Sequence, residues 1–377
     1  MSTPTSLQNA SVSPYPNDAY TIALIVSCEA EYSFATALLD DLYTVPQTLT
    51  LTQWQATWTS YALGTIKSLS STPHKVVIVS STGSNGQSSI DDAVIQALKD
   101  FPNIRAMIST GTASGVPKHT YPGDKDFFDI RLGDVVIGAE SPEYYGGVID
   151  YFASADGIGK ELDDTEKRVA PPRSILKGIN RMHEAHSKAC YDKWGVQHTQ
   201  INPLGEIIKK ALDKPYECLE GKCYNGPLGY TDRLFQPGYK HKVGGEDDHC
   251  CRCDEEGLVY RHDRKWEDKN TDRVPHIHHG FIASGAFHLD DTTLRHTLRT
   301  ELKAKCAEIH AWSLPSDFPV LVIRGIADYG DSHNGDGWTC HAGAAAAAAA
   351  REVLGYCYPF EIALEEPIDG EEYFGEE

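Results

Sequence analysis

Two carboxylates stand where the surrounding sequence predicts chemistry. Asp328 follows the apolar run 320–323 after a short segment, and Glu31 follows another apolar run at 20–26. Functional groups of α/β proteins gather at the carboxyl ends of strands, so both positions are typical of a site. A carboxyl whose pKa is raised by burial can donate a proton, and an ionised carboxylate can activate a water molecule. The pair predicts acid–base chemistry on a small molecule.

Each carboxylate also has a purely structural interpretation. Asp328 lies in the turn-like sequence DYGDS, where Asp commonly forms a turn or caps a helix. Glu31 and its neighbour Glu29 suit the first turn of a helix, where a negative charge is stabilised by the helix dipole. We favour the catalytic interpretation for Asp328 and Glu31.

The elements that must position these residues alternate between strands and helices. Apolar runs predict strands at 20–26, 75–80, 104–108, 134–138, 280–283 and 320–323. Amphipathic spacing predicts helices at about 30–39, 90–99, 175–188, 292–304 and 342–354. This alternation is typical of an α/β fold with a mainly parallel sheet covered on both faces.

Composition divides the chain into one domain and two tails. Residues 1–19 are rich in Ser, Thr, Pro and Asn and predict a flexible N-terminal tail. The α/β domain is expected over 20–356, with a charge-rich insertion at about 152–275. Residues 357–377 are predicted to form an acidic, solvated C-terminal tail.

Charge and hydropathy exclude several classes of function. The 34 Lys and Arg against 54 Asp and Glu give a formal net charge of -20, which repels a phosphate backbone, so no nucleic-acid polymer is expected as a partner. No apolar run reaches the roughly 20 residues that span a bilayer, and no signal peptide is recognisable, so no membrane partner is expected. Ten dilute cysteines predict reduced thiols and a cytoplasmic location.

Five segments, in order, resemble the nucleoside phosphorylase and nucleosidase superfamily, closest to a fungal branch whose members often sit beside signalling ATPase domains. The segments are IRAMISTGTASGVP (104–117), IRLGDVVI (130–137), DRLF (232–235), HGFIASG (279–285) and DFPVLVIRGIADYGDSH (317–333). The resemblance covers roughly residues 20–355. It implies a central mixed, twisted sheet, partly closed into a barrel and flanked by helices.

The resemblance implies an N-glycosidase that releases a free base, adenine above all, from a purine nucleoside or nucleotide. In the family, the Asp matching Asp328 faces N7 of the purine and protonates it, and the Glu matching Glu31 holds the nucleophilic water. Family phosphorylases tend to carry an Arg-bearing phosphate loop near the first strand, whereas no Arg or Lys occurs from residue 20 to 66. Hydrolysis is therefore favoured over phosphorolysis.

Two small-residue loops and an aromatic position complete the expected pocket. The loops 81–86 and 110–115 let backbone N–H groups approach an anion or sugar closely, and in the family the second lines the pocket for base and ribose. Phe287 or His288 falls where the family presents a residue against the base, and an aromatic face suits stacking on a purine. A core aromatic is the alternative for Phe287.

The sequence departs from the family pattern in AEIHAW, residues 307–312. Relatives usually have Glu-Met-Glu-Ala-Ala, whose second Glu grips the ribose hydroxyls; His310 replaces it here, and Glu308 matches the first Glu. An imidazole accepts fewer hydrogen bonds than a carboxylate and can carry positive charge. Weaker ribose binding, a changed or phosphorylated sugar, and an inactive binding or sensing module are the open alternatives. The residues expected to contact substrate are Gly83, Thr112, Ala113, Phe287, His288, Glu308, Ile309 and His310.

A cysteine cluster in the insertion raises a zinc alternative. Cys250, Cys251 and Cys253 lie near His241 and His249, and a C-x-x-C pair can supply half of a tetrahedral site. Because a second pair at conventional spacing is missing, a metal-free insertion is favoured, and neither metal nor cofactor is expected. Family members are commonly oligomers, so the resemblance leaves a homo-oligomer open.

Overall fold

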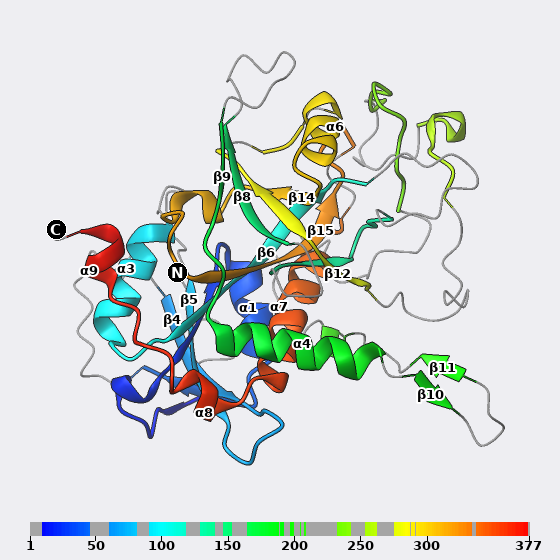
Figure 1. The fold of residues 1–377 in the computed structure, drawn as a ribbon. Coiled ribbons are helices and arrows are strands. Elements are labelled where there is room, and N and C mark those ends of the chain that lie inside the picture. The colour runs from blue at the N-terminus through cyan, green and yellow to red at the C-terminus, as the bar shows by residue number, and fades with distance from the viewer. Residues whose placement is uncertain are drawn as a thin grey trace.

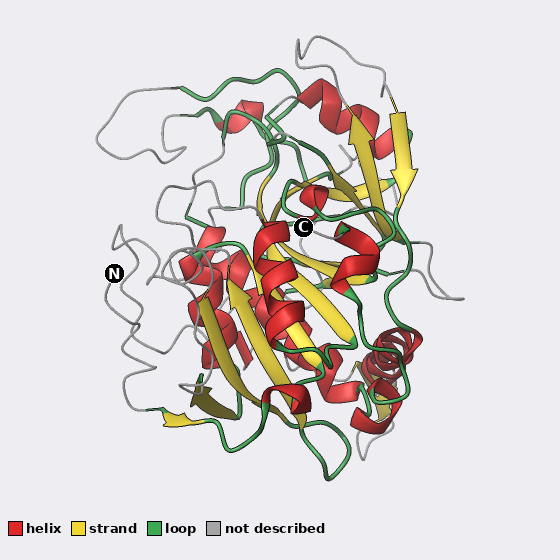
Figure 2. Ribbon diagram, turned by 90° about the vertical axis from the view of Figure 1, so that its left-hand side faces the viewer, coloured by secondary structure: helices red, strands yellow, loops and turns green. Residues whose placement is uncertain are grey.

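The molecule is built on one large mixed sheet (Figures 1 and 2). The computed structural model describes residues 10–45, 60–80, 90–117, 129–139, 146–152, 164–187, 189–191, 197–199, 204, 207–208, 232–242, 253–261, 275–286, 288–290, 292–333 and 337–375. The predicted α/β class, with a central mixed sheet flanked by helices, is confirmed.

The large sheet has 13 strands among the described residues. They are β1 (Ser11–Val12), β2 (Ile22–Val26), β3 (Asp41–Thr44), β4 (Ser60–Ile66), β5 (His74–Ser80), β6 (Ala106–Gly115), β7 (Val135–Gly138), β8 (Gly147–Phe152), β9 (Asp164–Lys167), β12 (Ile277–His279), β13 (Phe281–Ser284), β14 (Ala304–Glu308) and β15 (Val320–Asp328). The main path runs β1-β3-β4-β5-β2-β6-β14-β13-β8-β9. A separate pair joins β10 (Ala189–Tyr191) to β11 (Gln197–Thr199).

Helices cover both faces of the sheet. They are α1 (Glu29–Ala37), α3 (Ile90–Asp100), α4 (Arg173–Ser187), α6 (Thr292–Thr300), α7 (Thr339–Tyr356), α8 (Pro359–Ile362) and α9 (Gly370–Phe374). Alternate residues of β2 point to opposite faces, so Leu24 belongs to the core under α1, α4 and α7, and Ile25 to the core under α3. Among the described residues, no helix is both long enough and apolar enough to cross a lipid bilayer.

The sheet divides at β6. Residues 106–109 of β6 pair in parallel with β2, and its last residues, Ser114 and Gly115, pair antiparallel with β14. The other edge of β6 pairs with β15 from Met107 to Ser114. One edge of β6 therefore changes partner part-way, and the described strands form an unclosed sheet rather than the partly closed barrel that the resemblance implied.

Two strands continue beyond their predicted ends. The sequence predicted a loop at 110–115 and another before Asp328, but β6 runs to Gly115 and β15 to Asp328. Gly111, Ala113 and Gly115 have weak intrinsic strand preference, and pairing with β15, joined by β14 at the end of the strand, overrides it. The predicted helix 292–304 ends at Thr300, and Ala304 begins the strand β14.

Segments assigned to tails and insertion contribute to the packed structure. The insertion helix α4 buries Ile175, Ile179 and Met182 in the core that α7 also covers. In the expected C-terminal tail, Ile368 is buried, and the rings of α9 contact Phe318. In the expected N-terminal tail, β1 pairs with β3. Composition reports average polarity, whereas burial follows from individual apolar residues.

The expectation of uniformly reduced cysteines is corrected at one position. Cys340 is disulfide-bonded. Four other described cysteines, Cys28, Cys253, Cys306 and Cys357, are free. Cysteine number and spacing carry no information on which side chains the fold brings within bonding distance.

The alanine run of α7 is a packed helix, as the sequence predicted. Ala344–Ala350 are all buried. The helix approaches β15 so closely that a Cβ added at Gly325 would lie 1.9 Å from the backbone oxygen of Ala342. Small residues on both elements therefore set the distance between α7 and the strand that carries Asp328.

We expect Gly325→Ala to destabilise the fold by about 1–3 kcal/mol, because α7 must move away from β15. Chemical denaturation measures this loss. Gly355→Ala is the matched control, since nothing lies within 4 Å of a Cβ added there, near the end of α7. That substitution should leave stability unchanged or raise it by up to about 1 kcal/mol. Equal effects of the two substitutions would contradict the packing argument.

Candidate functional site

Asp328 lies at the end of β15, beside Ser114 of β6. The register between these strands shifts between Ile326 and Asp328, so Ala327 is an extra residue. Such a bulge re-aims the side chain that follows it. Arg324 turns into the core, while Asp328 is directed to Ser114 and accepts a hydrogen bond from the Gly330 N–H at 2.7 Å.

The surroundings of Asp328 favour its protonated form. Burial raises the pKa of Asp328 above its ordinary value of 3.8, and the nearby charge of Asp331 adds to the rise. Hydrogen bonds from Ser114 and Gly330 oppose this shift without reversing it. A carboxyl in such a setting is suited to donate a proton.

Glu31 is buried in the first turn of α1 and reaches back to Ser27. Its Oε2 accepts hydrogen bonds from the Ser27 N–H at 2.9 Å and from the Ser27 hydroxyl at 2.7 Å. This contact resembles a capping box and supports the structural interpretation of Glu31. The other oxygen, Oε1, faces β6, where a Cβ added at Gly111 would lie 3.0 Å from it. The Glu31 carboxylate therefore stabilises the first turn of α1 through Oε2 and faces the candidate site through Oε1.

Glu308 and Arg324 form an ion pair with no exposed side-chain surface. Glu308 Oε2 accepts from Arg324 Nη2 at 2.7 Å and from Nε at 3.1 Å. Both oxygens also accept from the Ala311 N–H. Burial, the largest single effect, would raise the pKa of Glu308, but the charge of Arg324 together with hydrogen bonds from Ser284 and Arg324 holds that pKa at about 2.

His310 contacts both Glu308, which is paired with Arg324, and Ser27, which is hydrogen-bonded to Glu31. Its N–H donates to Glu308 Oε2 at 2.9 Å, and its Nε2 lies 3.4 Å from the Ser27 hydroxyl. Burial lowers the pKa of His310, and the Arg324 charge lowers it further, so the imidazole is neutral at pH 7. His310, which departs from the pattern of the family that the sequence resembles, therefore contacts the Ser27 hydroxyl that donates to Glu31.

One further histidine lies within electrostatic range of both halves of the site. His288 lowers the pKa of His310 and also that of Asp328. The two proposed catalytic groups adjoin β6 at Gly111 and Ser114, positions separated by about 10 Å along a strand. The structure thus places Glu31, His310, His288 and Asp328 in one polar cluster around the end of β6.

The other predicted contact residues fall in or outside this cluster. Thr112 and Ala113 lie on β6 between Gly111 and Ser114, with Thr112 half-buried and Ala113 buried. Ile309 is half-buried and lies between Glu308 and His310. Gly83 and Phe287 lie outside the described residues.

Three residues that shape the site, Arg324, Ser27 and Ser114, had no role predicted from the sequence. Arg324 carried a usable signal, since a charged residue inside the apolar run VLVIRG is rarely buried without a partner. Ser27 and Ser114 are common small polar residues. Ser114 meets Asp328 only through the pairing of β6 with β15, and Ser27 meets His310 only through the packing of distant segments.

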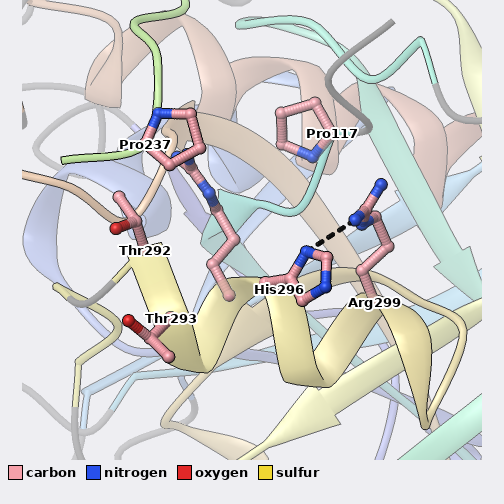
Figure 3. Close-up of a pocket in the computed structure, with 7 residues that line it drawn as sticks. Pro117, Pro237, Thr292, Thr293, His296 and Arg299 are labelled. Carbon is pink, nitrogen blue, oxygen red and sulfur yellow. Dashed lines mark hydrogen bonds between the residues drawn. The ribbon is translucent and has the colours of Figure 1, made fainter. Parts of the chain in front are cut away.

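A pocket of about 240 Å³ opens at α6 (Figure 3). It lies beside the loop that follows Asp328 rather than between the two carboxylates. Its lining residues are Pro117, Pro237, Thr292, Thr293, Arg295, His296 and Arg299. Arg295 donates to the Tyr329 carbonyl and lies 3.1 Å from Asp331 Oδ2, which connects the pocket to that loop. Arg299 Nη2 lies 2.8 Å from His296 Nδ1 (Figure 3). Its cationic lining suits a small anion such as phosphate.

The chain is similar in sequence to a far longer protein. It is 27% identical over 341 residues to a nucleotide-binding leucine-rich repeat (NLR)-like protein from Hyaloscypha variabilis. The match covers 89% of this chain and 29% of that protein, so the chain spans less than a third of the relative's length. No family model matches the chain.

Solved nucleosidase structures are similar in fold. A 5'-methylthioadenosine/S-adenosylhomocysteine nucleosidase from Neisseria meningitidis, in complex with methylthio-immucillin-A, is 14% identical, with 89% of this chain and 98% of that chain covered and a TM-score of 0.45. The corresponding nucleosidase from Helicobacter pylori is 11% identical, with 89% and 98% covered and a TM-score of 0.47. Futalosine hydrolase from the same organism is 10% identical, with 89% and 97% covered and a TM-score of 0.45.

The Glu308 pair predicts a pH-dependent stability. Because the pKa of Glu308 is about 2 in the folded protein against its ordinary 4.5, its contribution is present above about pH 5 and lost as pH falls toward 2. We expect a loss of about 2 kcal/mol in the free energy of unfolding by pH 3 from this group. Urea denaturation across this range measures it.

The double variant Glu308→Gln, Arg324→Met should lack that part of the pH dependence, because neither a titrating acid nor an unpaired buried charge remains. Glu29→Gln, which removes an exposed carboxylate, should retain it. An unchanged pH dependence in the double variant would show that Glu308 is not the responsible group.

Proposed function

We propose that the chain is an N-glycosidase that hydrolyses the bond between the base and sugar of a purine nucleoside or nucleotide. The observation that carries this proposal is Asp328, a buried carboxyl of raised pKa, in one polar cluster with the carboxylate of Glu31. Two such groups in different environments can divide the work of acid and base. The segment of β6 between them, about 10 Å long, matches the size of a nucleoside.

Asp328 supplies the proton in the proposed reaction. Its carboxyl protonates N7 of the purine as the bond from the sugar's anomeric carbon to N9 breaks. The bonding electrons pass to the base, which leaves as a neutral molecule, and positive charge develops on the sugar. Burial keeps Asp328 protonated at a higher pH than an exposed Asp, which favours this role. Solvent reprotonates it after product release.

Glu31 directs the water in the proposed reaction. Ser27 holds Oε2 through two hydrogen bonds, which leaves Oε1 directed toward β6. Oε1 orients the water and accepts its proton as the oxygen bonds to the anomeric carbon. Gly111 makes room for this arrangement, because any side chain there would crowd Oε1.

Water is favoured over phosphate as the attacking group. No Arg or Lys occurs from residue 20 to 66, the segment that supplies β2 and α1. Arg324 is fully buried and is engaged by Glu308 and by the hydroxyl and carbonyl of Ser109. The cationic pocket at α6 keeps phosphorolysis, or a phosphorylated substrate, as a specific alternative.

A nucleoside-binding sensor is the second candidate function. The carboxylate of Glu308 is enclosed by Arg324 and backbone N–H groups, and His310 is neutral, so neither residue presents a charged acceptor to a ribose. The relative is named as a nucleotide-binding protein, which favours a domain that binds a nucleotide without hydrolysing it.

We expect Asp328→Asn to reduce base release about 10²- to 10⁴-fold while sparing substrate binding, because the acid is lost and the shape retained. Glu31→Gln should reduce the rate over a similar range. Chromatography of free base from adenosine, AMP and ATP measures both. Asp317→Asn and Glu29→Gln, at exposed positions, are the matched controls and should retain full activity.

The same assay separates the alternatives. Product formation that strictly requires added phosphate and yields ribose 1-phosphate would establish phosphorolysis. Binding without base release from any donor would establish the sensor. A gain of activity in His310→Glu would show that the natural histidine weakens ribose binding.

The raised pKa of Asp328 predicts the pH profile and an effect on stability. The acid must be protonated, so kcat/KM should fall as pH rises through its pKa, and this limb should be absent in Asp328→Asn. A raised folded pKa contributes stability below the ordinary 3.8 that is lost as pH rises. Asp328→Asn should therefore unfold at a higher Tm than the natural protein at pH 7. A lower Tm would indicate a structural role.

A further inference from the structure

The insertion packs directly on the loop that follows Asp328. His241 donates its backbone N–H to the Ser332 hydroxyl at 3.0 Å, and Arg261 Nη1 donates to the Tyr329 hydroxyl at 2.8 Å. The ring of Phe235 stacks on His333 with 3.9 Å between centroids. Two described segments, 232–242 and 253–261, therefore enclose the loop 328–333.

Three metal-binding side chains meet at this contact. The ligand atoms of His241, Cys253 and His333 all lie within 4.8 Å of one another. Cys253 Sγ and His241 Nδ1 are 3.6 Å apart. Zinc bound at about 2.3 Å to sulfur and about 2.0 Å to nitrogen, with tetrahedral angles, sets these two ligands about 3.5 Å apart. The observed separation fits that geometry.

His333 supplies an independent indication of a ligand. The residue is 7% exposed, and its Nδ1 lies 3.2 Å from Asp331 Oδ1. Its Nε2 is buried and has no hydrogen-bond partner in the described structure. Metal-binding histidines characteristically give one ring N–H to a carboxylate and direct the other nitrogen to the metal. His333 has this arrangement.

We propose that His241, Cys253 and His333 bind a zinc ion that fastens the insertion to the loop carrying Asp328. A mixed set of one thiolate and two imidazoles favours zinc over the hard cations calcium and magnesium. The sequence alone favoured a metal-free insertion, because a second ligand pair at conventional spacing was missing. His333, far along the chain from the cysteine cluster, provides the ligand that the local spacing did not show.

The ion would act on the site by fixing the position of the loop that follows Asp328. Asp331 accepts from His333 through Oδ1 and pairs with Arg295 through Oδ2. Arg295 also donates to the Tyr329 carbonyl, next to Asp328. Zinc on His333 therefore fixes the loop from 329 to 333 through Asp331 and leaves the reacting groups free.

Metal content of the full 377-residue chain tests the proposal. After zinc-replete purification and dialysis, we expect about one zinc per chain, and less than about a tenth in Cys253→Ser and His333→Gln. The matched controls are Cys28→Ser and His296→Gln, which change exposed residues elsewhere and should keep about one zinc. Undiminished zinc in both ligand variants, or none in the natural chain, would overturn the proposal.

A cobalt titration of the natural chain does not depend on the folding of any variant. Co²⁺ bound by one thiolate and imidazoles in tetrahedral geometry gives intense visible absorption and a thiolate charge-transfer band. We expect both to appear, to saturate at about one equivalent and to disappear on addition of zinc. A spectrum like that of hydrated cobalt would overturn the proposal. Either result is independent of base release and therefore of the proposed activity.

Discussion

The site depends on the buried ion pair between Arg324 and Glu308. Two charges without exposed surface are costly unless each is fully engaged, and here Arg324 also reaches both oxygens of Ser109. The pair fixes β14, β15 and β6 relative to one another at the point where the sheet divides. Glu308 also shapes the turn that presents His310, and His310 contacts the serine that holds Glu31.

The division of the sheet brings the residues of the candidate site together. β6 exchanges β2 for β14 along one edge, while β15 follows the other edge and gains an extra residue before Asp328. A regular strand would direct Asp328 to the same face as Arg324, into the core. The bulge and the change of partner bring Asp328, the first turn of α1 with Glu31, and the turn that carries His310 to one end of β6.

The segment predicted as an insertion contacts the loop that follows Asp328. The Tyr329 hydroxyl donates to Asp232 at 2.5 Å and accepts from Arg261. Residues of both segments, 232–242 and 253–261, therefore hold the loop after Asp328 in place. Two basic side chains, Arg261 and Arg295 of α6, therefore contact this loop in a protein of net charge -20. The proposed zinc ion belongs to the same support, because His333 ends that loop.

Local pattern determined the main strands and helices and the α/β class, and it indicated the two carboxylates of the proposed site, because apolar runs and strand-end positions are properties of neighbouring residues. Tertiary structure decided the rest. β6 continues through GTAS because β15 pairs along it and β14 joins at Ser114, and Glu308 is buried with its charge paired by Arg324. Whether His310 meets Ser27, and whether His333 joins Cys253, depends on contacts between distant segments. Spacing along the chain does not encode such distances, since they follow from the packing of whole elements.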